Sequence, residues 1–302
     1  MAQQTQARTI ASTIDLAHTQ KERVFRSADY SETNLLNLVS LVKLIQNFFK
    51  DIYSYREYLK QSVARDLRKT YKRSYLGYVW SMLNPLLMMT ILAVVFSSIM
   101  RQNIEDYAVF LFAGMIPYAY FSSTNNGSLG TIRANARIMD QVPVPKYIFP
   151  LSIAFSNLVT FAISLVPLFL VTLVMGRDIP LTSLALPLIV LPLFFATVGT
   201  SLLLASANVF FEDTAHLTEV VLRALYFLTP ILYRRDQLPE WLMDYVIFNP
   251  MFCLVEFMRD LVYYGKFPDF STYCLHFAGC FLIMVVGLCL FKKTESKFIY
   301  YL

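Results

Sequence analysis

Charged residues are absent from five long stretches of this 302-residue sequence. The uncharged stretches are residues 74–100, 107–132, 147–176, 179–211 and 270–291. An α-helix rises about 1.5 Å per residue and the hydrocarbon core of a bilayer is about 30 Å thick, so roughly 20 apolar residues span it. Because 56% of all residues are hydrophobic, these stretches exclude an ordinary soluble fold and predict an integral membrane protein.

A sixth apolar segment, residues 217–233, differs from the others because it contains a charge, Arg223. We predict that it also forms a helix, which gives an all-α membrane protein with six transmembrane helices per protomer. Glu219 precedes Arg223 by four residues, so the two side chains share a helix face. Ion pairing, with the arginine reaching the inner interface, is the favoured interpretation, and a role in substrate binding stays open.

Residues suited to catalysis or metal binding are few and scattered. The three histidines, His18, His216 and His276, are isolated, and the four cysteines have no metal-ligand spacing. This pattern argues against a zinc site and against catalysis by a histidine-based group. We therefore expect no catalytic residue and no metal in this chain, and a disulfide between Cys253 and Cys274 stays an alternative.

The usual nucleotide-binding motif is also missing. The sequence has no G-x-x-x-x-G-K-[ST] loop, since Gly265-Lys266 lacks the upstream glycine and the following hydroxyl residue. The predicted spans lack the acidic residue that a proton- or sodium-coupled carrier usually needs, apart from Glu219 at one edge. We therefore expect a chain that is not an enzyme and has no cofactor of its own, and whatever drives any transport must come from another subunit.

Basic residues are distributed unequally between the segments that connect the predicted spans. If the N-terminus is cytoplasmic, the inner segments carry eight basic residues in 50–73, three in 133–146 and three in 292–302, whereas the outer segments carry six. Positive charge is enriched on the cytoplasmic side of membrane proteins, so both termini are expected in the cytoplasm. The net charge of +5 is therefore a signal of topology and no indication of nucleic-acid binding.

The N-terminal part of the chain is polar at first and then amphipathic. Residues 1–34 carry both charge signs and lack the apolar core of a signal peptide, so we assign residues 1–49 to a cytoplasmic extension. From Leu35 to Leu67, apolar residues recur every three or four positions among charged ones. This periodicity predicts an amphipathic helix on the inner membrane surface that ends at Gly77, and a soluble helix packed on a partner is the alternative.

Two connecting segments have distinctive patterns. In the outer connection, the amphipathic pieces 238–247 and 251–264 are separated by Asn249-Pro250. They predict two short re-entrant helices between spans 5 and 6, with a surface cap as the alternative. In the inner connection, residues 132–140 predict a short helix across the membrane axis that Pro143 and Pro145 stop, although the pattern alone also fits a plain basic loop.

Several motifs occur together in the order and spacing of a known family. They are the run from Arg65 to Trp80 with Asn84-Pro85-Leu86, Ala113-Gly114-Met115-Ile116-Pro117-Tyr118 with Phe121, residues 210–217, Thr229-Pro230-Ile231-Leu232-Tyr233, and Asn249-Pro250 leading to Glu256. From about Ile52 to the C-terminus the chain thereby resembles ABC-2 type permeases that export polysaccharides. It departs from the family in its N-terminal extension and in an acidic Phe211-Glu212-Asp213, where a basic residue often precedes the aspartate.

The resemblance implies a homodimeric six-helix permease, with residues 50–302 as the permease domain, in the bacterial inner membrane. It implies two copies of an ABC ATPase subunit as partners, which would hold the ATP and Mg²⁺. The implied substrate is a lipid-linked O-antigen, capsule or teichoic-acid-like polymer on an undecaprenyl-type carrier. Two alternatives stay open: an ABC-2 permease for a drug or small lipid, and a membrane-embedded glycosyl- or acyltransferase.

The resemblance also implies roles for individual residues. A coupling helix that docks in the ATPase, with a second contact beside it, would comprise Asn135, Arg137, Ile138, Met139, Asp140, Glu212 and Asp213. A site for the carrier pyrophosphate would comprise Arg65, Arg68, Lys69, Lys72, Arg73, Leu76 and Gly77. Attraction to anionic lipid explains most of these charges equally well. Tyr118 and Phe121 are candidates for a sugar path, because aromatic rings pack well against sugar C–H faces.

Overall fold

The computed structural model describes residues 38–71, 79–100, 104–141, 144–246 and 249–301, and this part of the chain is helical without a strand. The chain divides into two compact units, Met1–Asp51 and Ile52–Leu302. Helix α2 (Leu38–Ser54) begins in the first unit, and all the following elements belong to the second.

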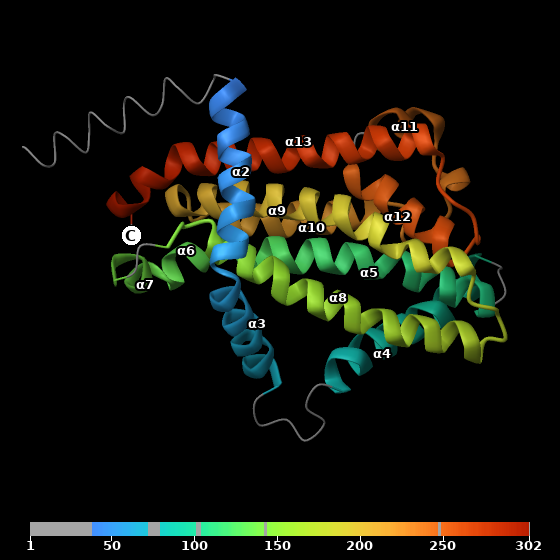
Figure 1. Ribbon diagram of the computed structural model, residues 1–302. Helices are drawn as coiled ribbons and strands as arrows, with labels where there is room; N and C mark the ends of the chain where they lie inside the picture. Colours follow the sequence, from blue (N-terminus) through green and yellow to red (C-terminus); the bar gives the residue numbers. More distant parts are fainter. Residues whose placement is uncertain (1–37, 72–78, 101–103, 142–143, 247–248, 302) are drawn as a thin grey trace, which may run out of the picture. The chain divides into compact units, whose positions relative to one another are not determined.

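The second unit is a bundle of long helices with short helices at both ends (Figure 1). The long helices are α4 (Val79–Met100), α5 (Ile104–Leu129), α8 (Ile148–Val174), α9 (Leu186–Phe210), α10 (Thr214–Leu228) and α13 (Phe270–Thr294). The shorter elements are α3 (Arg56–Tyr71), α6 (Thr131–Ala134), α7 (Ala136–Gln141), η1 (Leu181–Ala185), η2 (Arg235–Gln237), α11 (Glu240–Val246), α12 (Pro250–Val262) and η3 (Glu295–Tyr300).

By length and composition, three helical stretches of the described residues can cross a membrane: Ile148–Val174, Leu181–Phe210 and Phe270–Tyr300. They correspond to the third, fourth and last of the predicted uncharged spans. Helices α4 and α5 occupy the first two, and the apolar part of α4 is the shorter segment Leu86–Ile99. The prediction of an all-α protein with membrane-spanning helices is confirmed, whereas the number six stays a prediction.

Helix α10 is shorter than the segment 217–233 that the sequence analysis assigned to it. Its 15 residues end at Leu228, and Thr229 adopts an extended backbone conformation (φ −83°, ψ 130°). Pro230 follows, and the proline ring disfavours a helical conformation of the residue before it. At about 1.5 Å per residue, α10 is about 22 Å long, which is less than the thickness of the hydrocarbon core.

The predicted amphipathic helix is interrupted in the structure. It consists of α2 and α3, which are separated at Tyr55, and α3 ends at Tyr71. At the break, Arg56 Nη1 donates a hydrogen bond to the carbonyl oxygen of Tyr53 (3.1 Å). Gly77, the predicted end of the helix, lies outside the described residues.

Helix α3 packs against the beginning of α8. Leu59 and Ser62 of α3 are buried, and the rings of Tyr58 and Phe149 meet edge to face at 6.1 Å. Ser156 Oγ lies 3.3 Å from an oxygen of Asp66, one turn from the C-terminus of α3. This face of α3 therefore has a protein partner, and contact of α3 with the membrane surface stays a prediction.

Helices α9 and α13 form the most extensive contact in the bundle and run side by side in Figure 1. Two glycines allow their backbones to touch. A Cβ atom at Gly287 would lie 2.2 Å from the carbonyl oxygen of Gly199, and one at Gly199 would lie 2.5 Å from the backbone of Ile283. Close backbone approach at small residues is the usual way for membrane helices to associate, because burial of apolar side chains from lipid gives little driving force.

The beginning of α13 is fixed by its cap. Asp269 accepts hydrogen bonds from the hydroxyl of Ser271 and from the backbone and hydroxyl of Thr272, which lower the pKa of its carboxyl group to about 2. The carboxylate is therefore charged at physiological pH. An anion at this position stabilises the helix, because it faces unpaired N–H groups and the positive end of the helix dipole.

The outer connection contains two short helices, α11 and α12, as the sequence predicted. Asn249 caps α12, since its side-chain oxygen accepts a hydrogen bond from the backbone of Met251 (3.0 Å), and Pro250 occupies the first turn. The amide of Asn249 also donates to the hydroxyl of Thr229 (2.9 Å), which ties the start of α12 to the end of α10. Insertion of α11 and α12 into the membrane stays a prediction.

The guanidinium group of Arg259, on α12, is completely buried at this end of the bundle. Nη1 donates to the carbonyl oxygen of Pro230 (2.5 Å) and to the carboxylate of Glu256 (2.8 Å). Nη2 donates to the carbonyl oxygen of Ile231 (2.8 Å), and the guanidinium carbon lies 3.5 Å from the centre of the Phe110 ring. The side chain of Arg259 thus joins three parts of the chain: α12 itself, α5, and the residues that follow α10.

Space for this side chain is provided by a glycine of α5. A Cβ atom at Gly114 would lie 2.8 Å from Nη2 of Arg259. Burial of a charge is unfavourable unless the charge is paired and its hydrogen-bonding groups are satisfied. Arg259 meets both conditions, and its hydrogen bonds fix how α5, the end of α10 and α12 pack together.

We expect Gly287→Ala to destabilise the protein by about 1–3 kcal/mol, the usual cost of overpacking a close contact. The added methyl group would collide with the backbone of α9. The measurement is thermal unfolding of the purified protein in detergent. Gly279→Ala, in the same helix, is the matched control, because nothing lies within 4 Å of its Cβ position; equal stability of the two variants would contradict the close packing.

Arg259→Met is expected to lower the free energy of unfolding by about 3–5 kcal/mol, because it leaves the partly buried carboxylate of Glu256 without its cation. Arg235→Met is the control, since Arg235 is exposed near the same end, and its effect should stay within about 0.5 kcal/mol. A similar small effect of both substitutions would refute a structural role for the buried arginine.

Candidate functional site

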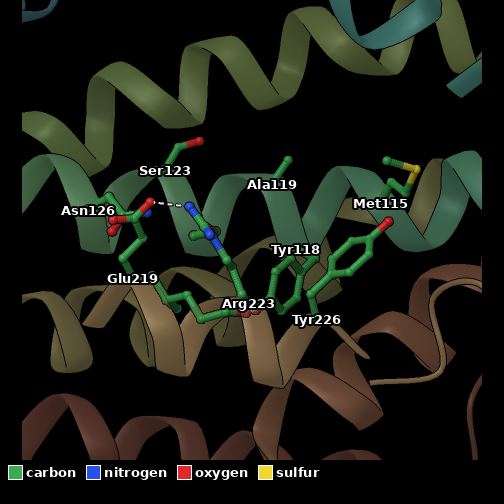
Figure 2. Close-up of a pocket in the computed structure, with 10 residues that line it drawn as sticks. Met115, Tyr118, Ala119, Ser123, Asn126, Glu219, Arg223 and Tyr226 are labelled. Atoms are coloured by element: carbon green, nitrogen blue, oxygen red, sulfur yellow. Dashed lines mark hydrogen bonds and ion pairs between the residues drawn. The ribbon is translucent and has the colours of Figure 1, made fainter. Parts of the chain in front are cut away.

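A cavity of about 320 Å³ lies between α5 and α10 (Figure 2). Its α5 wall contains Met115, Tyr118, Ala119, Ser122, Ser123 and Asn126, and its α10 wall contains Glu219, Leu222, Arg223 and Tyr226. The cavity has an aromatic end and a polar end, which come from successive turns of the same two helices.

Two tyrosines form the aromatic end. The rings of Tyr118 and Tyr226 meet edge to face, with centres 5.3 Å apart. Tyr118 is buried, and its hydroxyl donates a hydrogen bond to the carbonyl oxygen of Leu222. Its hydroxyl hydrogen is therefore occupied, and Tyr118 contributes mainly its ring to the cavity wall. Phe121 is also buried, 6.2 Å from the Tyr118 ring, and does not line the cavity.

An ion pair forms the polar end of the cavity. Arg223 Nη2 donates to the carboxylate of Glu219, one turn earlier on α10, so the predicted pairing is confirmed. Both side chains are more than half exposed, and Figure 2 shows the pair close to Asn126 and Ser123 of α5. A carboxylate, a guanidinium group, an amide and a hydroxyl can together bind the hydroxyl groups of a neutral polar ligand.

The inner connection forms two short helices, α6 and α7, where the sequence predicted one. Asn135 lies between them with φ −110° and ψ 14°, outside the helical range, and its side-chain amide donates to the carbonyl oxygen of Thr131 (2.7 Å). On α7, Arg137 is exposed, whereas Ile138 and Met139 are half-buried. The side chain of Asp140 is outside the described part of the structure.

Arg133 connects α6 to the end of α9. Its guanidinium group forms an ion pair with Glu212 and donates to the carbonyl oxygen of Val209 (3.2 Å). A second tie lies close by, where the amide of Asn208 donates to the carbonyl oxygen of Leu129 (2.9 Å). The structure therefore brings together the two segments that the sequence analysis assigned to ATPase contacts, and Asp213, the exposed residue after Glu212, belongs to the same surface.

The C-terminal segment packs against this same end of the bundle, where Figure 1 places α6, α7 and the C-terminus. Lys146, just before α8, donates to the carbonyl oxygen of Glu295 (2.7 Å). Phe298 of η3 is buried, with its ring 5.8 Å from that of Phe210 at the end of α9. These contacts hold the C-terminal segment at the same end of the bundle as α6 and α7.

The candidate pyrophosphate residues lie partly outside the described structure. Arg65 and Arg68 are exposed on α3, and Arg65 Nε lies 3.4 Å from the carboxylate of Asp66. The structure does not describe Lys72, Arg73, Leu76 and Gly77, nor the side chain of Lys69. Their arrangement as a phosphate site therefore stays a prediction.

The alternative of a disulfide is not realised in the structure. Cys253 is buried and Cys274 is exposed, and both are free thiols. Cys253 Sγ instead lies 2.7 Å from Nε2 of His276, whose Nδ1 lies 2.7 Å from the carbonyl oxygen of Thr272. The described residues contain no group of three or more histidine, cysteine or acidic side chains that could hold a metal ion.

A family model described as ABC-2 type transporter matches residues 57–263 of this chain. The chain belongs to the ABC-2 type transporter family. Related proteins include the O-antigen export system permease protein RfbA of Klebsiella pneumoniae, which is 32% identical over 78% of this chain and 90% of its own length. The protein of the same name from Myxococcus xanthus is 30% identical over 82% of this chain and 96% of its own length. The polysialic acid transport protein KpsM of Escherichia coli is 27% identical over 77% of this chain and 91% of its own length.

Two arginines that organise this ABC-2 type transporter were not singled out by the sequence analysis. Arg133 was counted only as one basic residue of an inner loop, and Arg259 only as one of an outer loop. The available signal for Arg259 was its position three residues after Glu256 in an otherwise apolar helix. No comparable signal existed for Arg133, because its partner Glu212 is 79 positions away.

We expect Arg133→Gln to increase hydrogen exchange of the α6 and α7 amides, because the substitution releases these helices from Glu212. Glu212→Gln should have the same effect, and the combined exchange Arg133→Glu with Glu212→Arg should restore protection. The measurement is hydrogen exchange followed by mass spectrometry. Arg137→Gln is the control, since Arg137 forms no ion pair among the described residues; identical exchange in all variants would show that the ion pair does not hold the loop.

Proposed function

We propose that this ABC-2 type transporter is the permease subunit of an ABC transporter that exports a lipid-linked polysaccharide. The observation that carries the proposal is the similarity of this chain to O-antigen export permeases. The identity is 30–32%, over about four fifths of this chain and nine tenths or more of the length of those permeases. The polymer would be an O-antigen, a capsule or a teichoic-acid-like chain on an undecaprenyl-type carrier. The fold supports this function through its apolar helices and its short helices at one end.

The proposed assembly contains two copies of this chain and two copies of an ABC ATPase subunit, in the bacterial inner membrane. Each protomer has six transmembrane segments, in which α4, α5 and α10 join the three apolar stretches already described, and the apolar chain up to Tyr233 lengthens the α10 segment. Residues 1–49 form a cytoplasmic extension, and residues 50–302 form the permease domain. Both termini are cytoplasmic. ATP and Mg²⁺ bind to the partner subunit, and this chain has no catalytic site of its own.

Contact with the ATPase takes place at α6 and α7 and at the adjacent end of α9. Asn135, Arg137, Ile138, Met139 and Asp140 form the coupling helix, with Glu212 and Asp213 as the second contact. Support comes from the ion pair of Arg133 with Glu212, which allows both contacts to respond to the ATPase together. The exposed guanidinium group of Arg137 is available for a partner.

The substrate enters beside α3 and the beginning of α4. Arg65, Arg68, Lys69, Lys72 and Arg73 attract the carrier pyrophosphate, and Leu76-Gly77 forms the turn that it reaches. Sugar units then pass the cavity between α5 and α10. There Tyr118 offers a ring face, with Phe121 packed behind it, and the pair Glu219–Arg223 binds hydroxyl groups.

The proposed function is tested by co-expression of this chain with its ABC ATPase subunit, followed by measurement of surface polymer and of ATP hydrolysis by the purified complex. Charge reversal at Arg137 combined with Met139→Gln should abolish export and lower polymer-stimulated ATP hydrolysis, without loss of the protein from the membrane. Normal export by this double variant would exclude α7 as the coupling helix. Efflux of a drug or small lipid without any polymer would reject the polysaccharide assignment.

The pyrophosphate site makes a separate prediction about the basic residues. If they bind phosphate bidentately, loss of export should be concentrated in one or two arginines, and Arg→Lys should not rescue it. If these residues only hold the chain on anionic lipid, each substitution should weaken binding to the membrane surface by about 1 kcal/mol or less. Added salt should then abolish the differences between the variants. The measurement is surface polymer per permease molecule after single substitution of Arg65, Arg68 and Arg73.

A further inference from the structure

A second cavity, of about 350 Å³, lies at the end of the bundle that carries α11 and α12. Five separate parts of the chain line it. They contribute Phe110 from α5, Arg234, Arg235 and Asp236 from the segment after α10, Met243 from α11, Glu256 from α12, and Tyr264 from the chain after α12. The function proposed above does not use this cavity.

The charges in this cavity are not balanced. The carboxylate of Glu256 is bound by the buried Arg259 at 2.8 Å. Arg234 and Arg235 form no ion pair within the described part of the chain, and Nε of Arg234 is buried there without a hydrogen-bond partner. Two arginines thus line the cavity together with one remaining acidic residue, Asp236.

One of the two arginines, Arg235, lies beside an aromatic ring. The guanidinium group of Arg235 lies 5.6 Å from the centre of the Phe252 ring. Such cation–π contacts position a guanidinium group while leaving its N–H groups free for a ligand. Tyr264, which is 45% exposed, adds a phenol hydroxyl to the cavity rim.

The chemistry of these groups selects an oxyanion. Arginine presents a planar fork of donors that matches carboxylate and phosphate groups, and such charge-assisted hydrogen bonds are stronger than neutral ones. Asp236 would repel a highly charged free anion, but its oxygens can accept hydrogen bonds from hydroxyl groups. A ligand with one anionic group and neighbouring hydroxyls therefore fits better than a bare anion.

We propose that this cavity, the Arg234–Arg235 pocket, binds an acidic sugar unit, in which the arginines hold a carboxylate or phosphate and Asp236 and Tyr264 hold hydroxyl groups. The identification of the ligand as a sugar rests on the proposed function. Helices α11 and α12, which contribute to the pocket, lie at the end of the bundle opposite α6 and α7 (Figure 1). In the proposed function this is the end where the polymer leaves the permease. The phosphate of a lipid headgroup has the same anionic chemistry, so the experiment must separate the two sources.

The test is direct binding to the purified full-length chain in phosphatidylcholine nanodiscs, with glucuronate, glucose 1-phosphate and glucose as probes in isothermal titration calorimetry. Glucuronate and glucose 1-phosphate should bind at least tenfold more tightly than glucose. Arg234→Gln and Arg235→Gln should each weaken acidic-sugar binding at least tenfold, and Arg→Lys should restore little of it.

Lys293→Gln is the control, because it removes an exposed cation of α13 that does not line the pocket. It should leave binding unchanged. Equal losses in Lys293→Gln and the arginine variants, or equal binding of glucose and glucuronate, would overturn the proposal.

Nanodiscs that contain phosphatidylglycerol identify the source of the anion. Acidic-sugar binding should persist in these nanodiscs. If it disappears, and native mass spectrometry shows that phosphatidylglycerol is retained only when Arg234 and Arg235 are present, the pocket binds a lipid headgroup. The assignment of the ligand as a sugar is then wrong. Because these measurements need no ATPase, they can fail while export succeeds. Conversely, absence of polymer export by the unmodified chain with its ATPase would reject the proposed function and leave the binding result standing.

Discussion

The packing of the buried guanidinium group of Arg259 is the constraint on which the arrangement of one end of this bundle depends. A permanently charged group is tolerated at a fully buried position only where its donors find acceptors. Here the acceptors come from three places in the chain: α5, the turn after α10 and α12 itself. If any of these were displaced, an arginine donor would lose its partner, so the three elements have a single favourable arrangement.

Helix α10 is held by polar ties at both of its ends. At one end, Arg259 binds the carbonyl oxygens of Pro230 and Ile231, and Asn249 binds Thr229. At the other end, Glu212 binds Arg133 of the short inner helices. Between these ties, α10 carries one wall of the α5–α10 cavity. A displacement of α6 and α7 would therefore act on the end of α9 and, through Glu212, on the start of the helix that carries Glu219 and Arg223.

The helices were predictable from the sequence because their causes are local. Long uncharged stretches predicted α5, α8 and α13 to within about three residues, and Asn249-Pro250 marked the start of α12. The stretch 179–211 covers both η1 and α9, so the start of α9 was placed too early. The end of α10 was placed too late, although Pro230 supplied the necessary signal, because the apolar run continues past it to Tyr233. The division of the inner connection at Asn135 was missed, since no proline or glycine marks it between Thr131 and Gln141.

The candidate sites were less predictable, because they depend on which residues of distant segments meet. The pairing of Glu219 with Arg223 follows from helical spacing and was predicted. The contact of Arg133 with Glu212, the burial of Arg259 and the shared cavity of Phe110 and Arg234 all require the tertiary structure. Tyr118 was selected as a candidate from its motif, but only the structure shows that its hydroxyl is bound to Leu222.

The glycine contact between α9 and α13 limits how this protein can change shape. A Cβ atom at either Gly199 or Gly287 would collide with the facing backbone, so a shift that places another residue at this contact is unfavourable. The two helices are therefore expected to move together. Opening of a path for a large substrate then requires a change in how the other helices pack on this pair.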